Sequence, residues 1–180
     1  VQNRLAQNRD YERWQDRGLG VHWRDILTRS DALQSKHVLA WTWVISPAPD
    51  LMALVPEERR RELVCDLTER IVEDYYLARG FDVAEYAYIL HDRETDEAGM
   101  QQLHTHVVLP GTAPLPGADR AAVYNNKERG HDALFRDIAS QHFSAALDDI
   151  AGPEWRRLRE AEPDVEPPGM NDLDAWFGRR

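Results

Sequence analysis

Hydrophobic and polar positions follow strand-like and helix-like patterns in turn along the chain. Residues 37–45 (His-Val-Leu-Ala-Trp-Thr-Trp-Val-Ile) are rich in β-branched and aromatic side chains and stop at Ser46-Pro47, which predicts a strand. The apolar run is nearly continuous, so we expect this strand to be central in its sheet, with both faces covered. Two further strands are predicted at 86–90 and 103–109, joined by an acidic loop at 93–102.

Helical spacing dominates two long segments. The first opens at Pro56, carries Glu57 and Glu58 in its first turn, where the helix dipole favours acids, and stops at Gly80. The second covers 131–150, where apolar residues recur along one stripe. Shorter helices are expected at 3–17 and 21–35. The stretch 110–119 is rich in Pro and Gly and predicts a loop.

This order of elements predicts an α+β protein with an antiparallel central sheet and helices packed on its face. The 180 residues fit one domain, which we expect at 1–160 with the N-terminal helical segment 1–35 included. Residues 161–180 are acidic and Pro-rich and predict a C-terminal tail.

Composition excludes several classes of protein. No run approaches the roughly 20 apolar residues needed to cross a bilayer, so no membrane partner is expected. Cys65 is the only cysteine, which excludes a disulfide scaffold. The first residues lack the apolar segment of a secretory signal, so the expected location is the cytoplasm.

Charge is unevenly distributed. The 32 acidic and 22 basic residues give a net charge of −10, which argues against binding duplex DNA by phosphate neutralisation alone. Residues 1–30 nevertheless carry six Arg against four acids, whereas 145–175 carry nine acids against three Arg. The first segment can therefore face a polyanion and the last cannot.

The strongest chemical signal is a group of histidines on the second and third predicted strands. Side chains alternate along a strand, so His104 and His106 share one face. His91 ends the neighbouring predicted strand and can bring a third imidazole to that face. Apolar flanks place the pair on a buried type of strand, where unsatisfied imidazoles would be costly. We therefore predict a divalent-metal site.

These residues carry a resemblance to a known family. The strand Leu103-His-Thr-His-Val-Val-Leu109, together with Trp43-Val-Ile-Ser-Pro-Ala-Pro49 and the long helix between them, resembles the HUH endonucleases, and within them the relaxase/mobilisation nuclease domains. The similarity covers roughly residues 37–112. One departure is the acidic loop, which sets His91 further ahead of the pair than in the shortest relaxases.

The resemblance implies an HUH/ferredoxin-like relaxase fold and a specific activity. It implies that His104, His106 and His91 bind Mg²⁺ or Mn²⁺, and that a tyrosine attacks a phosphate of single-stranded DNA at an origin of transfer. That tyrosine would stay linked to the 5′ phosphate during plasmid or integrative-element mobilisation. Accessory mobilisation proteins are the other partners it suggests.

Two tyrosines are candidates for the nucleophile. Relaxases place it on an N-terminal helix ahead of the first strand, often followed closely by Arg, which favours Tyr11 in Tyr11-Glu-Arg13. Rolling-circle replication initiators place it after the histidine strand, which would favour Tyr124. A phenol has a pKa of about 10, so either group needs a nearby cation or base to attack at neutral pH.

Other functions remain open at this point. A rolling-circle replication initiator would use the same histidines, and a metal-dependent hydrolase would use them with activated water and form no protein–DNA adduct. A non-catalytic DNA-binding module on the same scaffold would agree with the net charge of −10.

Overall fold

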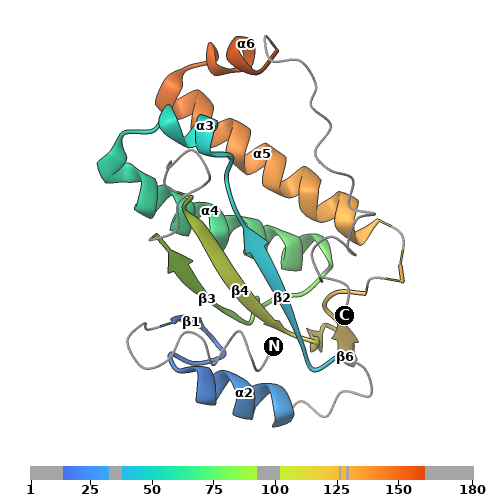
Figure 1. Ribbon diagram of the computed structural model, residues 1–180. Coiled ribbons are helices and arrows are strands. Elements are labelled where there is room, and N and C mark those ends of the chain that lie inside the picture. The colour runs from blue at the N-terminus through green and yellow to red at the C-terminus, as the bar shows by residue number, and fades with distance from the viewer. Residues whose placement is uncertain (1–13, 33–37, 93–101, 126, 129, 161–180) are drawn as a thin grey trace, which may run out of the picture.

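A four-stranded antiparallel sheet forms the centre of the protein, in the strand order β1-β3-β4-β2 (Figure 1). The computed structural model describes residues 14–32, 38–92, 102–125, 127–128 and 130–160. The four strands are β1 (Gln15–Arg17), β2 (Ala40–Ile45), β3 (Tyr86–His91) and β4 (His104–Pro110). The α+β class predicted from the pattern is confirmed.

The pairing register decides which side chains share a face of the sheet. In β4, Thr105, Val107 and Leu109 point to one side, and the alternate residues point to the other. We call the first side the helix-pair face. We call the second the histidine face, because it carries His104 and His106, with Val108 following them.

Two long helices cover the helix-pair face: α4 (Glu57–Ala78) and α5 (His131–Ala151) (Figure 1). Both lie within two residues of the predicted bounds. Apolar residues at helical spacing on α4, among them Ile71 and Tyr75, pack against Val107 and Leu109 of the sheet. Fourteen buried residues form this core, which makes it the largest of the three apolar clusters among the described residues.

The histidine face is covered at one end by the short helix α2 (Trp23–Ala32) (Figure 1). Ile26 of α2 is fully buried and packs with Trp14, and with Ala87 and Val108 of the sheet. Along β4 the histidines follow one another toward the other end of this face. The sequence interpretation expected long helices on one face only, and α2 adds a helix to the opposite one.

Smaller elements complete the fold around the ends of the sheet. Helix α3 (Pro49–Ala53) follows β2, and α6 (Trp155–Glu160) follows α5. Strands β5 (Thr112–Leu115) and β6 (Ala118–Ala122) form a separate hairpin. No helix in the described part of the chain has the length and apolar character to span a bilayer.

Three expectations about individual elements are wrong. The helix expected to reach Arg17 gives way to β1, whose three exposed polar residues pair with β3, and the expected helix's residues 1–13 lie outside the described ranges. Strand β2 was predicted to be central, but among the described residues it pairs only with β4 and lies at the edge of the sheet. Its apolar run is explained by packing, because its residues contribute to apolar clusters on both faces. The loop expected at 110–119 contains the β5–β6 hairpin, because Gly117 adopts the positive φ of 76° that its turn requires.

Candidate metal centre

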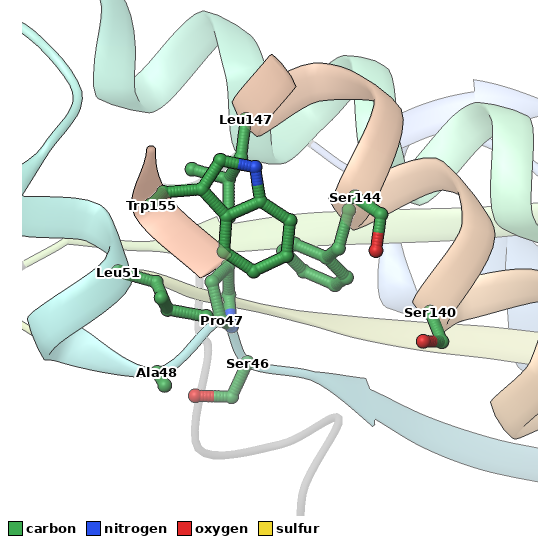
Figure 2. Close-up of a pocket in the computed structure, with 9 residues that line it drawn as sticks. Ser46, Pro47, Ala48, Leu51, Ser140, Ser144, Leu147 and Trp155 are labelled. Carbon is green, nitrogen blue, oxygen red and sulfur yellow. The ribbon is translucent and has the colours of Figure 1, made fainter. Parts of the chain in front are cut away.

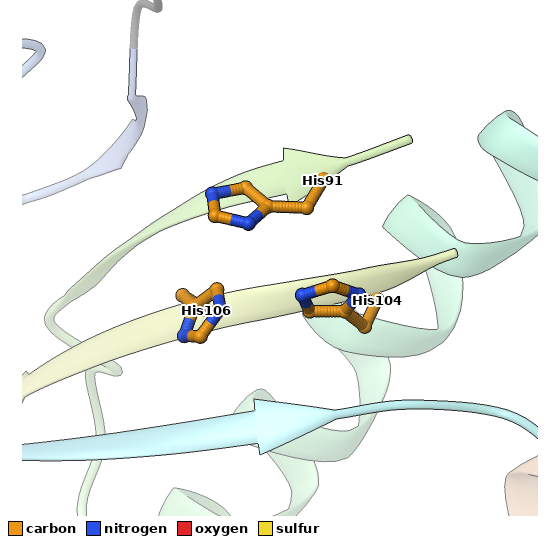
Figure 3. Close-up of side chains that lie close together, drawn as sticks. All are labelled: His91, His104 and His106. Atoms are coloured by element: carbon orange, nitrogen blue, oxygen red, sulfur yellow. The ribbon is translucent and has the colours of Figure 1, made fainter. Parts of the chain in front are cut away.

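Three histidines converge on the histidine face: His91 from β3, and His104 and His106 from β4 (Figure 3). One ring nitrogen from each can be chosen so that all lie within 4.8 Å of one another. The ring centroids are 4.6 Å apart for His91 and His106 and 5.1 Å apart for the other two pairs. The sequence prediction that these side chains share a face is therefore met by the structure.

The strand register explains this convergence. His91 is directly opposite His104 in the β3–β4 ladder, and His106 lies two residues further along β4 on the same face. Directly opposite residues in an antiparallel pair have Cβ atoms about 4.5–5.5 Å apart, and diagonal neighbours remain within reach of long side chains. The cluster thus follows from backbone pairing.

A buried hydrogen bond holds Thr105, the β4 residue between His104 and His106. Thr105 is fully buried on the helix-pair face, and its hydroxyl lies 2.7 Å from the hydroxyl of Thr68 on α4. The Thr68 hydroxyl donates to the Val64 carbonyl, so the proton between the two threonines comes from Thr105. This contact fixes β4 to α4 at the level where His104 and His106 leave the opposite face.

The environment of His104 selects one of its two nitrogens for a metal. Its Nδ1 lies 3.0 Å from the backbone carbonyl oxygen of Gln102, and a carbonyl only accepts, so Nδ1 carries the proton. In the neutral ring this leaves the lone pair on Nε2. A metal-binding histidine commonly donates its other N–H to a backbone carbonyl, which fixes the ring orientation. His104 is only 6% exposed, so the ring is held in place before any ion binds.

The three imidazoles fit a divalent ion as a donor set. Neutral imidazole suits zinc, copper, iron and nickel, whereas Mg²⁺ and Mn²⁺ are usually bound through oxygen. The all-imidazole set therefore departs from the usual ligands of both ions implied by the sequence resemblance, and Mg²⁺, with its strict octahedral oxygen geometry, fits it least.

Two other histidines have different partners. The Nε2 of His131 lies 2.8 Å from a Glu128 carboxylate oxygen, and its Nδ1 lies 2.7 Å from the hydroxyl of Tyr75. His142 bonds Asp74 of α4 through Nε2, at 2.7 Å. His131 begins α5, yet it is only 5% exposed, because its contact with Tyr75 links α5 to α4 in the core. Neither residue belongs to the metal cluster.

Asp92 follows His91 and forms an ion pair with Arg61 of α4. Alternation turns its side chain away from that of His91. The ion pair ties the end of β3 to α4.

The two candidate nucleophiles are placed differently. Tyr124 packs edge-on against Trp41 and Trp43, at centroid distances of 4.7 and 5.9 Å. Trp41 and Trp43 are paired with Leu109 and Val107 of β4, so their side chains lie on the helix-pair face. Tyr124 packs against them there, on the opposite side of the sheet from the histidines. Desolvation and the bond to the Asp132 carboxylate raise the pKa of Tyr124 far above that of a free phenol. Tyr11 lies outside the described residues.

Comparison with known proteins adds no family to this picture: no protein-family model matches the chain, and no curated protein matches it. The class that the fold and site define is an α+β protein with a three-histidine candidate metal centre on an antiparallel sheet.

Proposed function

We propose that this protein is a metal-dependent enzyme that nicks and transfers single-stranded DNA, a relaxase acting in plasmid or integrative-element mobilisation. The observation that carries the proposal is the convergence of His91, His104 and His106 on one sheet face. The resemblance of the β4 sequence and its surroundings to relaxase domains supplies the substrate class.

In this proposal the three imidazoles would hold the ion, with His104 binding through Nε2 because its Nδ1–H donates to the Gln102 carbonyl. The bound ion supplies positive charge to the non-bridging oxygens of the scissile phosphate. The chain itself orients the ligands through the β3–β4 register and through the Thr105–Thr68 contact.

We assign the nucleophile to Tyr11. Strand β1 runs antiparallel to β3, with Gln15 opposite Tyr88, so the chain ahead of β1 starts from the side of the sheet where β3 continues to His91. Tyr11 is three residues before Trp14, and three extended residues span at most about 10 Å. The chain that carries Tyr11 therefore enters β1 from the end of the sheet where the histidines lie.

The reaction is a transesterification. The phenolic oxygen of Tyr11 attacks phosphorus and loses its proton, the bond from phosphorus to the 3′ oxygen breaks, and that oxygen leaves as a protonated hydroxyl. The product is a tyrosyl ester of the 5′ phosphate, which retains the bond energy for religation. An activated water would instead leave a free 5′ phosphate.

A labelling experiment tests this assignment. Single-stranded origin-of-transfer DNA, labelled at the 3′ end, is incubated with Mn²⁺ and run on a denaturing gel. The wild-type protein and Tyr124→Phe should give a slow, protease-sensitive band that EDTA abolishes, and Tyr11→Phe should give none. Cleavage without that band would indicate a hydrolase, and EDTA-insensitive binding without cleavage would indicate a binding module. A band lost in Tyr124→Phe and kept in Tyr11→Phe would favour a replication initiator.

A further inference from the structure

A pocket of about 210 Å³ lies where β2 leaves the sheet, between the β2–α3 connection, α5 and α6 (Figure 2). Its walls come from three segments that are far apart in the sequence. The nine lining residues are Ser46, Pro47, Ala48, Leu51, Ser140, Phe143, Ser144, Leu147 and Trp155. Neither the metal centre nor the tyrosine chemistry uses any of them.

The aromatic wall of this pocket is held in place by polar contacts. Trp155 is 4% exposed, and its indole N–H donates to an Asp148 carboxylate oxygen at 2.8 Å. Arg156 bonds both oxygens of the same carboxylate, each at 2.6 Å, and its guanidinium lies 4.9 Å from the centre of the indole ring. These contacts tie α6 to α5, so the wall exists before a ligand arrives.

The lining selects for an uncharged, flat group with a polar edge. None of the nine lining side chains is charged, so the pocket offers nothing to neutralise a phosphate or a carboxylate. Phe143 and Trp155 supply aromatic surface, and three serines supply hydroxyls that both donate and accept hydrogen bonds. The volume is below the 300–1,000 Å³ or so typical of pockets for drug-sized ligands, which suits a single ring system.

The position of the pocket relates it to the metal centre. Ile45 is opposite Thr105, the residue between the two β4 ligands, and Ser46 follows Ile45 directly. Neighbouring strands are about 4.8 Å apart, so the backbone of β2 leaves the sheet one strand away from Thr105. The α5 wall of the pocket lies on the helix-pair face, so a DNA strand that also contacts the histidines passes around the end of β2 to enter the pocket. A polymer with a charged backbone and neutral rings can place a backbone charge at the histidine cluster and a ring in the pocket.

We propose that the pocket binds one unpaired base of the single-stranded DNA whose phosphate lies at the histidine cluster, an inference that rests on the proposed function. Enzymes that act on unpaired bases seat them in pockets that combine aromatic stacking with hydrogen bonds. Stacking on aromatic side chains is largely independent of base sequence. The pocket should therefore add affinity for any single strand, and the test does not require the natural DNA site.

Cavity filling tests the proposal in the intact chain. Ser144→Phe places a ring in the pocket, and Ala145→Phe places the same ring on an exposed position of α5 that does not line it. The probes are a 12-nucleotide oligothymidylate and an abasic strand of the same length. Loss of one stacked base should weaken oligothymidylate binding to Ser144→Phe by about 5- to 150-fold. Ala145→Phe should stay within about twofold, and all three proteins should bind the abasic strand equally.

A second measurement uses the wild-type protein and so does not depend on how a variant folds. Oligothymidylate carrying 5-iodouracil is irradiated in the complex, and the crosslinked peptides are identified by mass spectrometry. Attachment at Phe143 or Trp155 supports the proposal. Crosslinks confined to other residues, together with unchanged binding by Ser144→Phe, overturn it and leave the pocket to a ligand other than DNA.

The outcomes separate this inference from the proposed function. A protein that nicks DNA in the labelling experiment but shows no pocket dependence keeps its function and loses the base site. A protein that shows pocket-dependent binding but never nicks keeps the base site and loses the nickase assignment. Absence of binding to any single strand removes both.

Discussion

The two faces of the sheet are built differently. The helix-pair face is covered by α4 and α5 over a core of 14 buried residues. Aromatic side chains pack within this core; the ring centroids of Trp43 and Tyr75, for example, are 4.9 Å apart. The histidine face has the ten-residue helix α2 over a smaller cluster, and beyond it the three imidazoles. His91 and His106 are half-buried, while Val107, which follows His106 and points to the other face, is fully buried.

The difference separates stability from chemistry within single strands. Consecutive residues of β4 alternate between anchoring the fold and presenting a ligand: Thr105 bonds α4, and His104 and His106 face the candidate metal. A rigid strand therefore orients the ligands while the other face provides the buried area. Substitutions on opposite faces of β4 should consequently affect different measurements.

The largest expected effect is on metal binding by His106→Ala. Loss of a residue that only hydrogen-bonds to a metal-binding side chain already costs about 10- to 100-fold in metal affinity, so loss of a direct ligand should cost more than about 100-fold for Mn²⁺. Isothermal titration calorimetry measures the affinity. The melting temperature without metal should change little, because His106 is half-buried. Equal Mn²⁺ affinity in His106→Ala and wild type would exclude the site.

Val107→Ala is the counterpart on the helix-pair face. Val107 is fully buried, so losing two carbons and leaving a cavity should lower the free energy of unfolding by about 2–3 kcal/mol. The matched control is Val44→Ala on the neighbouring strand, where the side chain is 46% exposed and the cost should stay below about 1 kcal/mol. Urea denaturation measures both. Metal affinity should be retained in Val107→Ala, and a large loss would contradict the separation of the faces.

The smallest expected effect concerns Tyr75, on the buried side. Burial raises the pKa of Tyr75 to about 12, so between pH 10 and 12 the folded protein keeps a proton that the unfolded chain has lost. Stability present below pH 10 therefore falls as pH rises through this window. Tyr75→Phe has no phenol at this position to titrate. Its free energy of unfolding should therefore fall less steeply with pH than that of the wild type, and the two slopes should differ by at most about 1.4 kcal/mol per pH unit. Denaturation curves at pH 9 and 11 compare the two; identical slopes would contradict this.

Patterns within single elements were predicted well because they depend on local periodicity. Helix α4 follows from its N-terminal Pro, its acidic first turn and its apolar spacing, and the shared face of His104 and His106 follows from strand alternation. The β3–β4 pairing was accessible because the two strands are adjacent in sequence, and it brought His91 into the site.

Features that depend on distant segments were not predictable in this way. Strand β1 consists of three polar residues, and only its pairing with β3 makes it a strand. The burial of His131 depends on Tyr75, 56 positions away. The pocket of Figure 2 combines residues around 46, 143 and 155, and no local pattern indicates that they meet.

The direct opposition of His91 and His104 has an evolutionary consequence. The ladder sets the distance between these ligands, so the number of residues connecting the two strands is not constrained by coordination. Insertions and deletions between positions 91 and 104 should be tolerated as long as the hairpin still pairs. Homologues are therefore expected to vary in length at this connection while keeping three imidazoles in the same arrangement, and a fixed sequence spacing is a poor criterion for recognising them.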